Sequence, residues 1–146
     1  MRRTSSLTAI VVAMAVGVTA AWAQGAVRYV GKKHGKVVVS LRVAPASAMV
    51  TRMTIRYRVT CDNGGSATRS TQLTNLRINH SGHVAFHGSY KGTQDGSTNH
   101  VTLRGTVTRK RAVGTFKLKA VGVDAASGGR VRCHSATVRW RAKRVR

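Results

Sequence analysis

The sequence predicts an all-β fold in which two antiparallel sheets pack face to face as a β-sandwich of about eight or nine strands. Apolar residues recur at every second position over most of the chain after residue 23, and almost no helical spacing is present. Val, Thr, Ile and Tyr are frequent in these stretches, and glycine-containing turns separate them at roughly 8–12-residue intervals. We expect an Ig-like or jelly-roll-like order, with closure into a barrel as the alternative.

Residues 1–23 precede the predicted strands and have the pattern of a secretory signal peptide. Two arginines near the start are followed by an apolar run at 7–18 and by a small-x-small cleavage pattern at 21–23. The run is about a dozen residues long, whereas a membrane-spanning helix needs about 20. We therefore expect cleavage before Gln24 and a single β-sandwich domain at 24–146, secreted or associated with the cell envelope and without a transmembrane span.

Each predicted strand is defined by the apolar side chains on one of its faces. In chain order, these inward positions are Val37, Val39, Leu41 and Val43; Met53, Ile55, Tyr57, Val59 and Cys61; Leu76 and Ile78; Val84, Phe86, Gly88 and Tyr90; Val101, Leu103, Gly105 and Val107; Gly114, Phe116, Leu118 and Ala120; and Val138, Trp140 and Ala142. Polar residues alternate with them, which is typical of strands with one buried face.

The connections between these strands carry residues that suit tight turns. Asp-Asn-Gly-Gly at 62–65, Ser-Gly at 81–82, Asp-Gly at 95–96 and Gly-Gly at 128–129 all tolerate positive φ. The apolar positions change from odd to even numbers between Cys133 and Val138. We therefore expect a turn or bulge at 134–137.

Cys61 and Cys133 are the only cysteines of the chain, so just one intramolecular disulfide is possible. Exported proteins mature where disulfides persist, and we predict this pairing, with two free buried thiols as the alternative. The bond would close a 72-residue loop, which the chain-entropy model values at about 4 kcal/mol. Because the chain has no Cys-x-x-Cys pair, we expect a structural role.

The charge of the chain is strongly unbalanced, with 26 Lys and Arg against 3 Asp and no Glu, a formal net charge of +23. Removal of residues 1–23, which contain two arginines, leaves 123 residues with a formal charge of +21. Apart from a basic C-terminal tail at 141–146, the positive residues mostly alternate with the apolar positions. The candidate polyanion-binding residues are Arg52, Arg56, Arg58, Arg104, Lys117, Lys119, Arg139, Arg141 and Lys143.

A folded surface with this charge attracts polyanions. We expect a monomeric, non-enzymatic module that associates with anionic polymers of the cell envelope or extracellular matrix through its Arg- and Lys-rich sheet faces. In one alternative the charge only solvates the surface, and a carbohydrate or protein ligand binds in a salt-insensitive way. A cationic membrane-active protein is the second alternative. Sequence-specific nucleic-acid binding is not expected, because no recognition helix is present.

The residues needed for catalysis or metal binding are not arranged in a known pattern. Asp62, Asp95 and Asp124 each fit a turn rather than the carboxylate pair of a glycosidase, and no G-x-S-x-G motif occurs. His83 and His87 share a strand face but are separated by about 13 Å, too far to hold one ion. We therefore expect no enzymatic activity, no metal and no cofactor.

Several short motifs together resemble a group of small exported bacterial single-disulfide β-sandwich proteins of uncharacterised function. The motifs are Tyr29-x-Gly31 with Gly35, Cys61-Asp62-x-Gly64, Ser81-Gly82 before Val84-x-Phe86, Ala112-Val113-Gly114-Thr115, and Cys133-x-Ser135 running to Trp140-x-Ala142. The resemblance implies the fold and the disulfide but no activity. The chain departs from the group at Ala136, where a glycine commonly follows the serine.

Overall fold

The computed structural model describes residues 25–92 and 96–146, and this part of the chain forms nine β-strands and one short 3-10 turn at Pro45–Ser47. The strands are β1 Val27–Lys33, β2 Lys36–Ala44, β3 Met49–Cys61, β4 Ser66–Arg77, β5 His83–Lys91, β6 Thr98–Val107, β7 Arg111–Val123, β8 Arg130–Ser135 and β9 Val138–Val145. The all-β prediction is confirmed. The expected signal peptide and its cleavage point before Gln24 lie outside the described residues. Asp95 also lies outside them.

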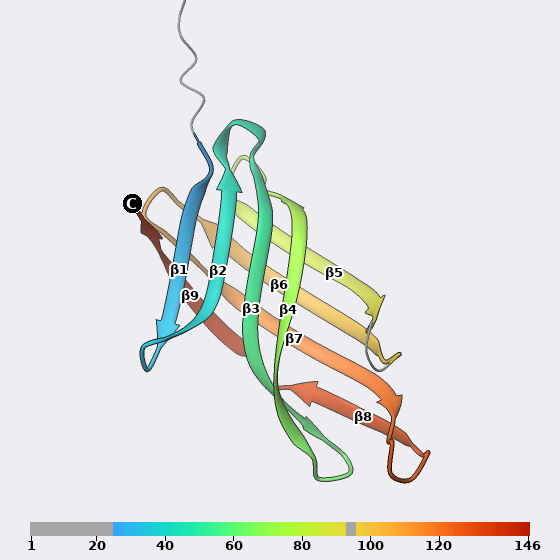
Figure 1. Cartoon of the computed structure of the whole chain (residues 1–146). Helices are drawn as coiled ribbons and strands as arrows, with labels where there is room; N and C mark the ends of the chain where they lie inside the picture. The colour runs from blue at the N-terminus through green and yellow to red at the C-terminus, as the bar shows by residue number, and fades with distance from the viewer. Residues whose placement is uncertain (1–24, 93–95) are drawn as a thin grey trace, which may run out of the picture.

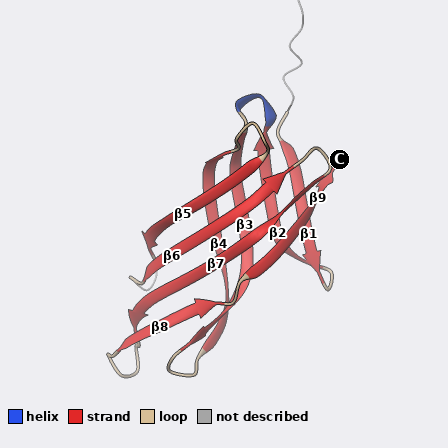
Figure 2. Ribbon diagram, turned by 180° about the vertical axis from the view of Figure 1, so that it is seen from behind, coloured by secondary structure: helices blue, strands red, loops and turns tan. Residues whose placement is uncertain are grey.

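The strands are arranged in two layers that cross obliquely (Figure 1). The front layer has the order β4-β3-β2-β1 and the back layer the order β9-β7-β6-β5, and neighbouring strands within both are antiparallel. Figure 2 shows the same layers from behind, with β5, β6 and β7 running side by side. Because consecutive strands pair directly in most of each layer, the strand order is a pair of meanders and differs from the expected Ig-like or jelly-roll-like order.

Two strands join the layers into a closed ring. β9 pairs with β1 as well as with β7, and the short strand β8 pairs with β3 on one side and with β7 on the other. Six strands therefore form the circuit β3-β2-β1-β9-β7-β8, while β4 extends the front layer and β6 and β5 extend the back layer. The two-layer sandwich and the barrel closure considered as its alternative thus coexist in one fold.

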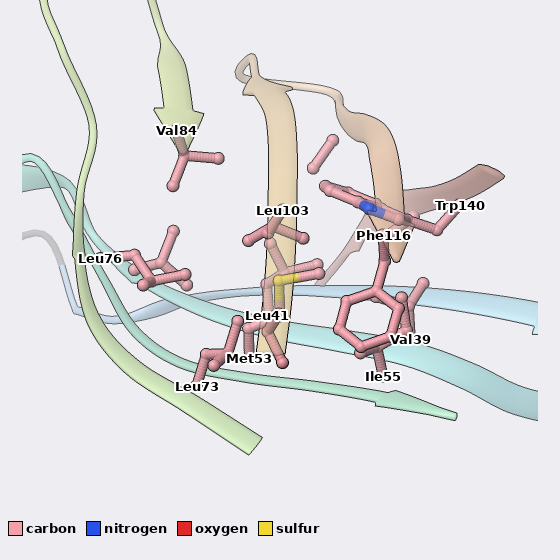
Figure 3. Close-up of a cluster of buried hydrophobic side chains, with 14 of the residues drawn as sticks. Val39, Leu41, Met53, Ile55, Leu73, Leu76, Val84, Leu103, Phe116 and Trp140 are labelled. Carbon is pink, nitrogen blue, oxygen red and sulfur yellow. The ribbon is translucent and has the colours of Figure 1, made fainter. Parts of the chain in front are cut away.

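The core lies between the layers and is built from the inward positions of the alternating strands (Figure 3). Leu41, Met53 and Ile55 of the front layer and Phe116 of the back layer are fully buried. The rings of Tyr57 and Phe116 contact each other across the core, with their centroids 4.7 Å apart. Their burial removes apolar surface from water, which is the main favourable contribution to folding.

Trp140 lies in a slot made by two glycines. It is in register with Gly114 of β7, which is in turn in register with Gly105 of β6. A Cβ atom at Gly105 would come within 2.7 Å of the indole, and one at Gly114 within 2.5 Å. Only glycine therefore leaves room for the indole at these two positions, which fall on the apolar face that the sequence predicts.

Three segments differ from the sequence predictions. A register shift between Gly31 and Lys32 turns Val37 outward, so that it is 45% exposed rather than part of the inward face. β4 begins at Ser66, although only its end was predicted, because its first half is almost entirely polar. The segment 141–146 is no tail: residues up to Val145 belong to β9, where the main chain pairs with β1.

The change of phase near the end of the chain is a change of strand, as predicted. β8 ends at Ser135 and β9 begins at Val138. At the same place β7 exchanges one partner for the other, pairing with β9 up to Phe116 and with β8 from Lys119 onward. The backbone N–H of Leu118 falls in this gap and donates a hydrogen bond of 2.9 Å to the buried Oγ of Ser135. Ser135 therefore satisfies a backbone group that neither strand pairs.

Three hydroxyl groups link the edge strands of the two layers. Tyr57 and Thr71 share a hydrogen bond of 2.7 Å, and Thr71 shares another of 3.0 Å with Tyr90 of β5.

Burial raises the pKa of the Tyr57 hydroxyl. Burial also raises the pKa of Tyr29, whose hydroxyl donates a hydrogen bond of 2.8 Å to the carbonyl of Thr108. Both phenols are thus held in the neutral form.

We expect the protein to lose stability above pH 10, the ordinary pKa of tyrosine. Both pKa values are higher in the folded protein than in the unfolded chain, so the stabilising contribution is complete below pH 10 and is lost as the pH rises through the folded-state values. Urea denaturation at about pH 8 and about pH 11 measures this loss. Tyr57→Phe should reduce it; an undiminished loss in that variant would contradict the role of Tyr57.

Candidate polyanion-binding surface

The nine basic residues that the sequence singles out are all exposed, but they lie on two opposite outer faces. Arg52, Arg56 and Arg58 are on β3 and point outward from the front layer. The other six are on the outer face of the back layer, on β6, β7 and β9; they are Arg104, Lys117, Lys119, Arg139, Arg141 and Lys143. They therefore do not form a single basic sheet face.

The structure nevertheless brings three of them together in one cleft. Arg56 and Arg58 of β3 and Arg139 at the start of β9 line a cleft of about 630 Å³ at the β1–β2 turn. Lys33, His34 and Lys36 of that turn complete its basic lining. We call these six residues and the space between them the hairpin cleft. Apolar residues also line the cleft, among them Val38, Ile55, Val138 and Trp140.

Five of the six basic residues of the hairpin cleft lie on paired strands, and His34 lies in the β1–β2 turn. Arg58 is further held by a hydrogen bond of 2.8 Å from its Nη2 atom to Oγ of Ser66 on β4. Among the described residues, no Asp or Glu lines the cleft. Five Lys and Arg side chains therefore share one concave surface without a lining carboxylate, which makes the local potential positive.

A second basic group, which we call the arginine row, crosses the upper part of the front layer. Arg28, Arg42 and Arg52 lie on β1, β2 and β3 in direct register. Beside them on the same outer face, Ser40 is in register with Thr54, and Thr54 with Gln72 of β4. The side chains of both rows line a cavity of about 230 Å³.

A third concavity, the terminal cleft, connects the arginine row to the end of the chain. Its volume is about 810 Å³, and Arg28 lines both it and the cavity of the arginine row. The other basic residues of its lining come from the β6–β7 turn and from the C-terminus; they are Arg109, Lys110, Arg144 and Arg146.

The outer face of the back layer is different in character. Cross-strand hydrogen bonds between β5 and β6 join His83 to Thr106, His87 to Thr102, Ser89 to His100 and Lys91 to Thr98. Three histidines thus face solvent in a polar ladder, with Lys117 and Lys119 on the adjoining strand. One ring nitrogen of each histidine shares a hydrogen bond with a hydroxyl group. None of the three concavities described above is lined by these histidines.

The two described side-chain carboxylates, those of Asp62 and Asp124, line none of these three concavities. An oxygen of Asp62 accepts a hydrogen bond of 3.1 Å from the backbone N–H of Arg132. Asp124 accepts hydrogen bonds from the N–H of Ala126, from the Asn63 amide and from the Ser127 hydroxyl, which lower the pKa of its carboxyl. Asp124 therefore has the turn role that the sequence predicts, whereas the Asp62 carboxylate binds the backbone of the neighbouring strand β8.

The predicted disulfide is present and joins Cys61 to Cys133. The two cysteines are direct cross-strand partners at the place where β8 meets β3, so the bond lies at the closure of the ring. Beside it, a cavity of about 340 Å³ opens between the layers and is lined largely by small and apolar residues such as Val59, Leu118 and Ala120.

Within residues 25–92 and 96–146, no three His, Cys, Asp or Glu side chains are grouped so that they could hold a metal ion. The same part of the chain contains no helix that is long and apolar enough to cross a membrane.

The basic residues that complete the hairpin cleft and the cavity of the arginine row are missing from the set that the sequence predicts. Arg28 and Arg42 alternate with the buried Tyr29, Leu41 and Val43, so their outward direction follows from the same strand pattern that identified Arg52. Lys33 and Lys36 carry no such signal, because they flank a turn whose approach to β9 depends on the closure of the ring. Comparison of the chain with family models, with curated protein sequences and with solved structures gives no match.

Proposed function

We propose that the protein is an exported, monomeric and non-enzymatic protein that binds anionic polymers of the cell envelope or extracellular matrix. The observation that carries this proposal is the hairpin cleft, where five Lys and Arg side chains line one cavity without a lining Asp or Glu among the described residues. Export is supported by the signal pattern at 1–23, by the disulfide and by the resemblance to small exported bacterial proteins.

Binding of a polymer would relieve an unfavourable arrangement of charge. The cations of the hairpin cleft repel one another, and a polyanion that fills the cleft both neutralises them and releases the counterions condensed on the polymer. Arginine guanidinium groups also donate paired hydrogen bonds to phosphate, sulfate and carboxylate groups. We therefore expect an affinity that falls steeply as the salt concentration rises.

The test compares two triple variants that remove the same charge from different places. The first variant removes three cations from the hairpin cleft and is Arg56→Gln/Arg58→Gln/Arg139→Gln. The second removes three cations from the outer face of the back layer and is Arg104→Gln/Lys117→Gln/Lys119→Gln. We expect the first to weaken binding to heparin and to teichoic acid by about tenfold or more, about 1.4 kcal/mol. The second should change binding by only about twofold, because its charges act at longer range.

Binding is measured as the dissociation constant for labelled heparin and for teichoic acid at several NaCl concentrations, and circular dichroism verifies that both variants fold. Equal losses in the two variants would show that the net charge alone is responsible and would reject the cleft. If the unaltered protein bound neither polymer at low salt, the proposed function itself would have to be abandoned.

A further inference from the structure

The arginine row places like charges where a β-sheet ordinarily avoids them. Arg28, Arg42 and Arg52 are in direct register on adjacent strands, which are about 4.8 Å apart in a sheet. Like charges at directly opposed positions repel each other and destabilise the sheet. Because all three side chains are exposed, they can turn toward a common anion that neutralises them.

Uncharged hydrogen-bonding groups complete the cavity beside this row. Ser40 and Thr54 are half-buried, face the same side of the sheet and lie one outward position along their strands from Arg42 and Arg52. Leu41 also lines the cavity, but its side chain is 1% exposed and packs into the core. The accessible lining is therefore made of guanidinium, hydroxyl and amide groups.

We propose that this cavity binds a single tetrahedral oxyanion, either a phosphate or a sulfate group. A carboxylate has two oxygens in one plane, and one guanidinium fork can engage both of them. A tetrahedral group has oxygens in several directions, which suits donors that approach from three strands and from the hydroxyls of Ser40 and Thr54. The site shares no residue with the hairpin cleft, and binding here does not depend on the proposed polymer binding.

A titration of inorganic phosphate followed by phosphorus NMR, at constant ionic strength maintained with NaCl, tests the site. We expect saturable binding that sulfate displaces and that an equal concentration of acetate does not. Arg42→Gln, at the centre of the row, should raise the dissociation constant for phosphate about tenfold. Ser40→Ala/Thr54→Val, which leaves the net charge unchanged, should raise it about fivefold or more, the loss expected for two neutral hydrogen bonds.

Arg104→Gln is the matched control, because Arg104 is exposed on the back layer and lines neither the hairpin cleft nor the cavity of the arginine row. It should leave phosphate binding within about twofold of the original value. Non-saturating binding, equal effects of Arg42→Gln and Arg104→Gln, or full phosphate binding after loss of both hydroxyls would overturn the proposal. If acetate displaced phosphate as effectively as sulfate does, the proposed selectivity for a tetrahedral oxyanion would be overturned.

Two further arms identify the source of the oxyanion and separate the site from the proposed function. If Arg42→Gln also weakens the binding of a glycerol phosphate polymer, the site holds a phosphodiester of that polymer. If it weakens only inorganic phosphate binding, the site serves free phosphate. The triple variant of the hairpin cleft should retain phosphate binding, so failure of polymer binding and failure of this site give different results.

Discussion

Reduction of the Cys61–Cys133 disulfide should lower the free energy of unfolding by about 4 kcal/mol. The bond spans 72 residues, a segment that contains all of β4, β5, β6 and β7. In the unfolded chain it restricts this long segment, and its reduction releases conformational entropy that stabilises the unfolded state. A loss of this size is a large part of the 5–15 kcal/mol that stabilises a typical native protein.

Urea denaturation of the oxidised protein, the reduced protein and the Cys61→Ala/Cys133→Ala variant measures this effect. The variant should resemble the reduced protein in its midpoint, and a reducing agent should have no further effect on it. A decrease below about 1 kcal/mol on reduction would contradict the prediction and would mean that the unfolded state is already restricted in another way.

Substitution of Gly114 by alanine should destabilise the protein by about 3 kcal/mol, the upper range for an overpacked core. The new Cβ atom would meet the carbonyl oxygen of Arg104 and would lie 2.5 Å from Cζ2 of Trp140. Both neighbours are constrained: the carbonyl belongs to a paired strand, and the indole is 5% exposed. The sheet or the indole must therefore move.

Gly122→Ala provides a matched control on the same strand. A Cβ atom at Gly122 would meet only Ser97, at 3.4 Å, which is an ordinary contact. We expect that this substitution changes stability by less than about 0.5 kcal/mol. Urea denaturation compares the two variants, and Trp140, the only tryptophan after residue 23, also reports displacement of the indole by its fluorescence. Equal stabilities of the two variants would contradict the steric conflict that we expect between a Cβ atom at position 114 and the indole of Trp140.

Much of the fold follows from the sequence because alternation is explicit where a strand has one buried and one exposed face. β3 and β7 are of this kind, and most of their buried residues are those that the sequence predicts; Val50 and Ala112, which are also buried, are not among the predicted positions. β4 is an edge strand with few buried side chains, so its polar first half carries no such signal. Val37 faces outward because the register between β1 and β2 shifts. This shift depends on the pairing of two strands, so the alternation within β2 alone does not predict it.

The candidate sites follow from the sequence only in part. The outward direction of Arg52, Arg56 and Arg58 is set by their own strand, and the structure has them exposed on the face expected. The gathering of Arg139 with Lys33 and Lys36 requires the ring to close, and the arginine row requires the register of three strands. These are non-local properties, and a periodic pattern within one strand contains no information about them.

The position of β9 in the ring has a consequence for the order of events in folding. The last strand of the chain lies between β1 and β7, and its pairing brings Arg28 opposite Val145, near the two ends of the described chain. Such distant pairing is slow because a long loop must close before the contacts form. Until β9 is available, the circuit lacks the strand that pairs with both β1 and β7, although β8 can already connect β3 to β7. The circuit therefore closes only after residues 138–145 have been added to the chain.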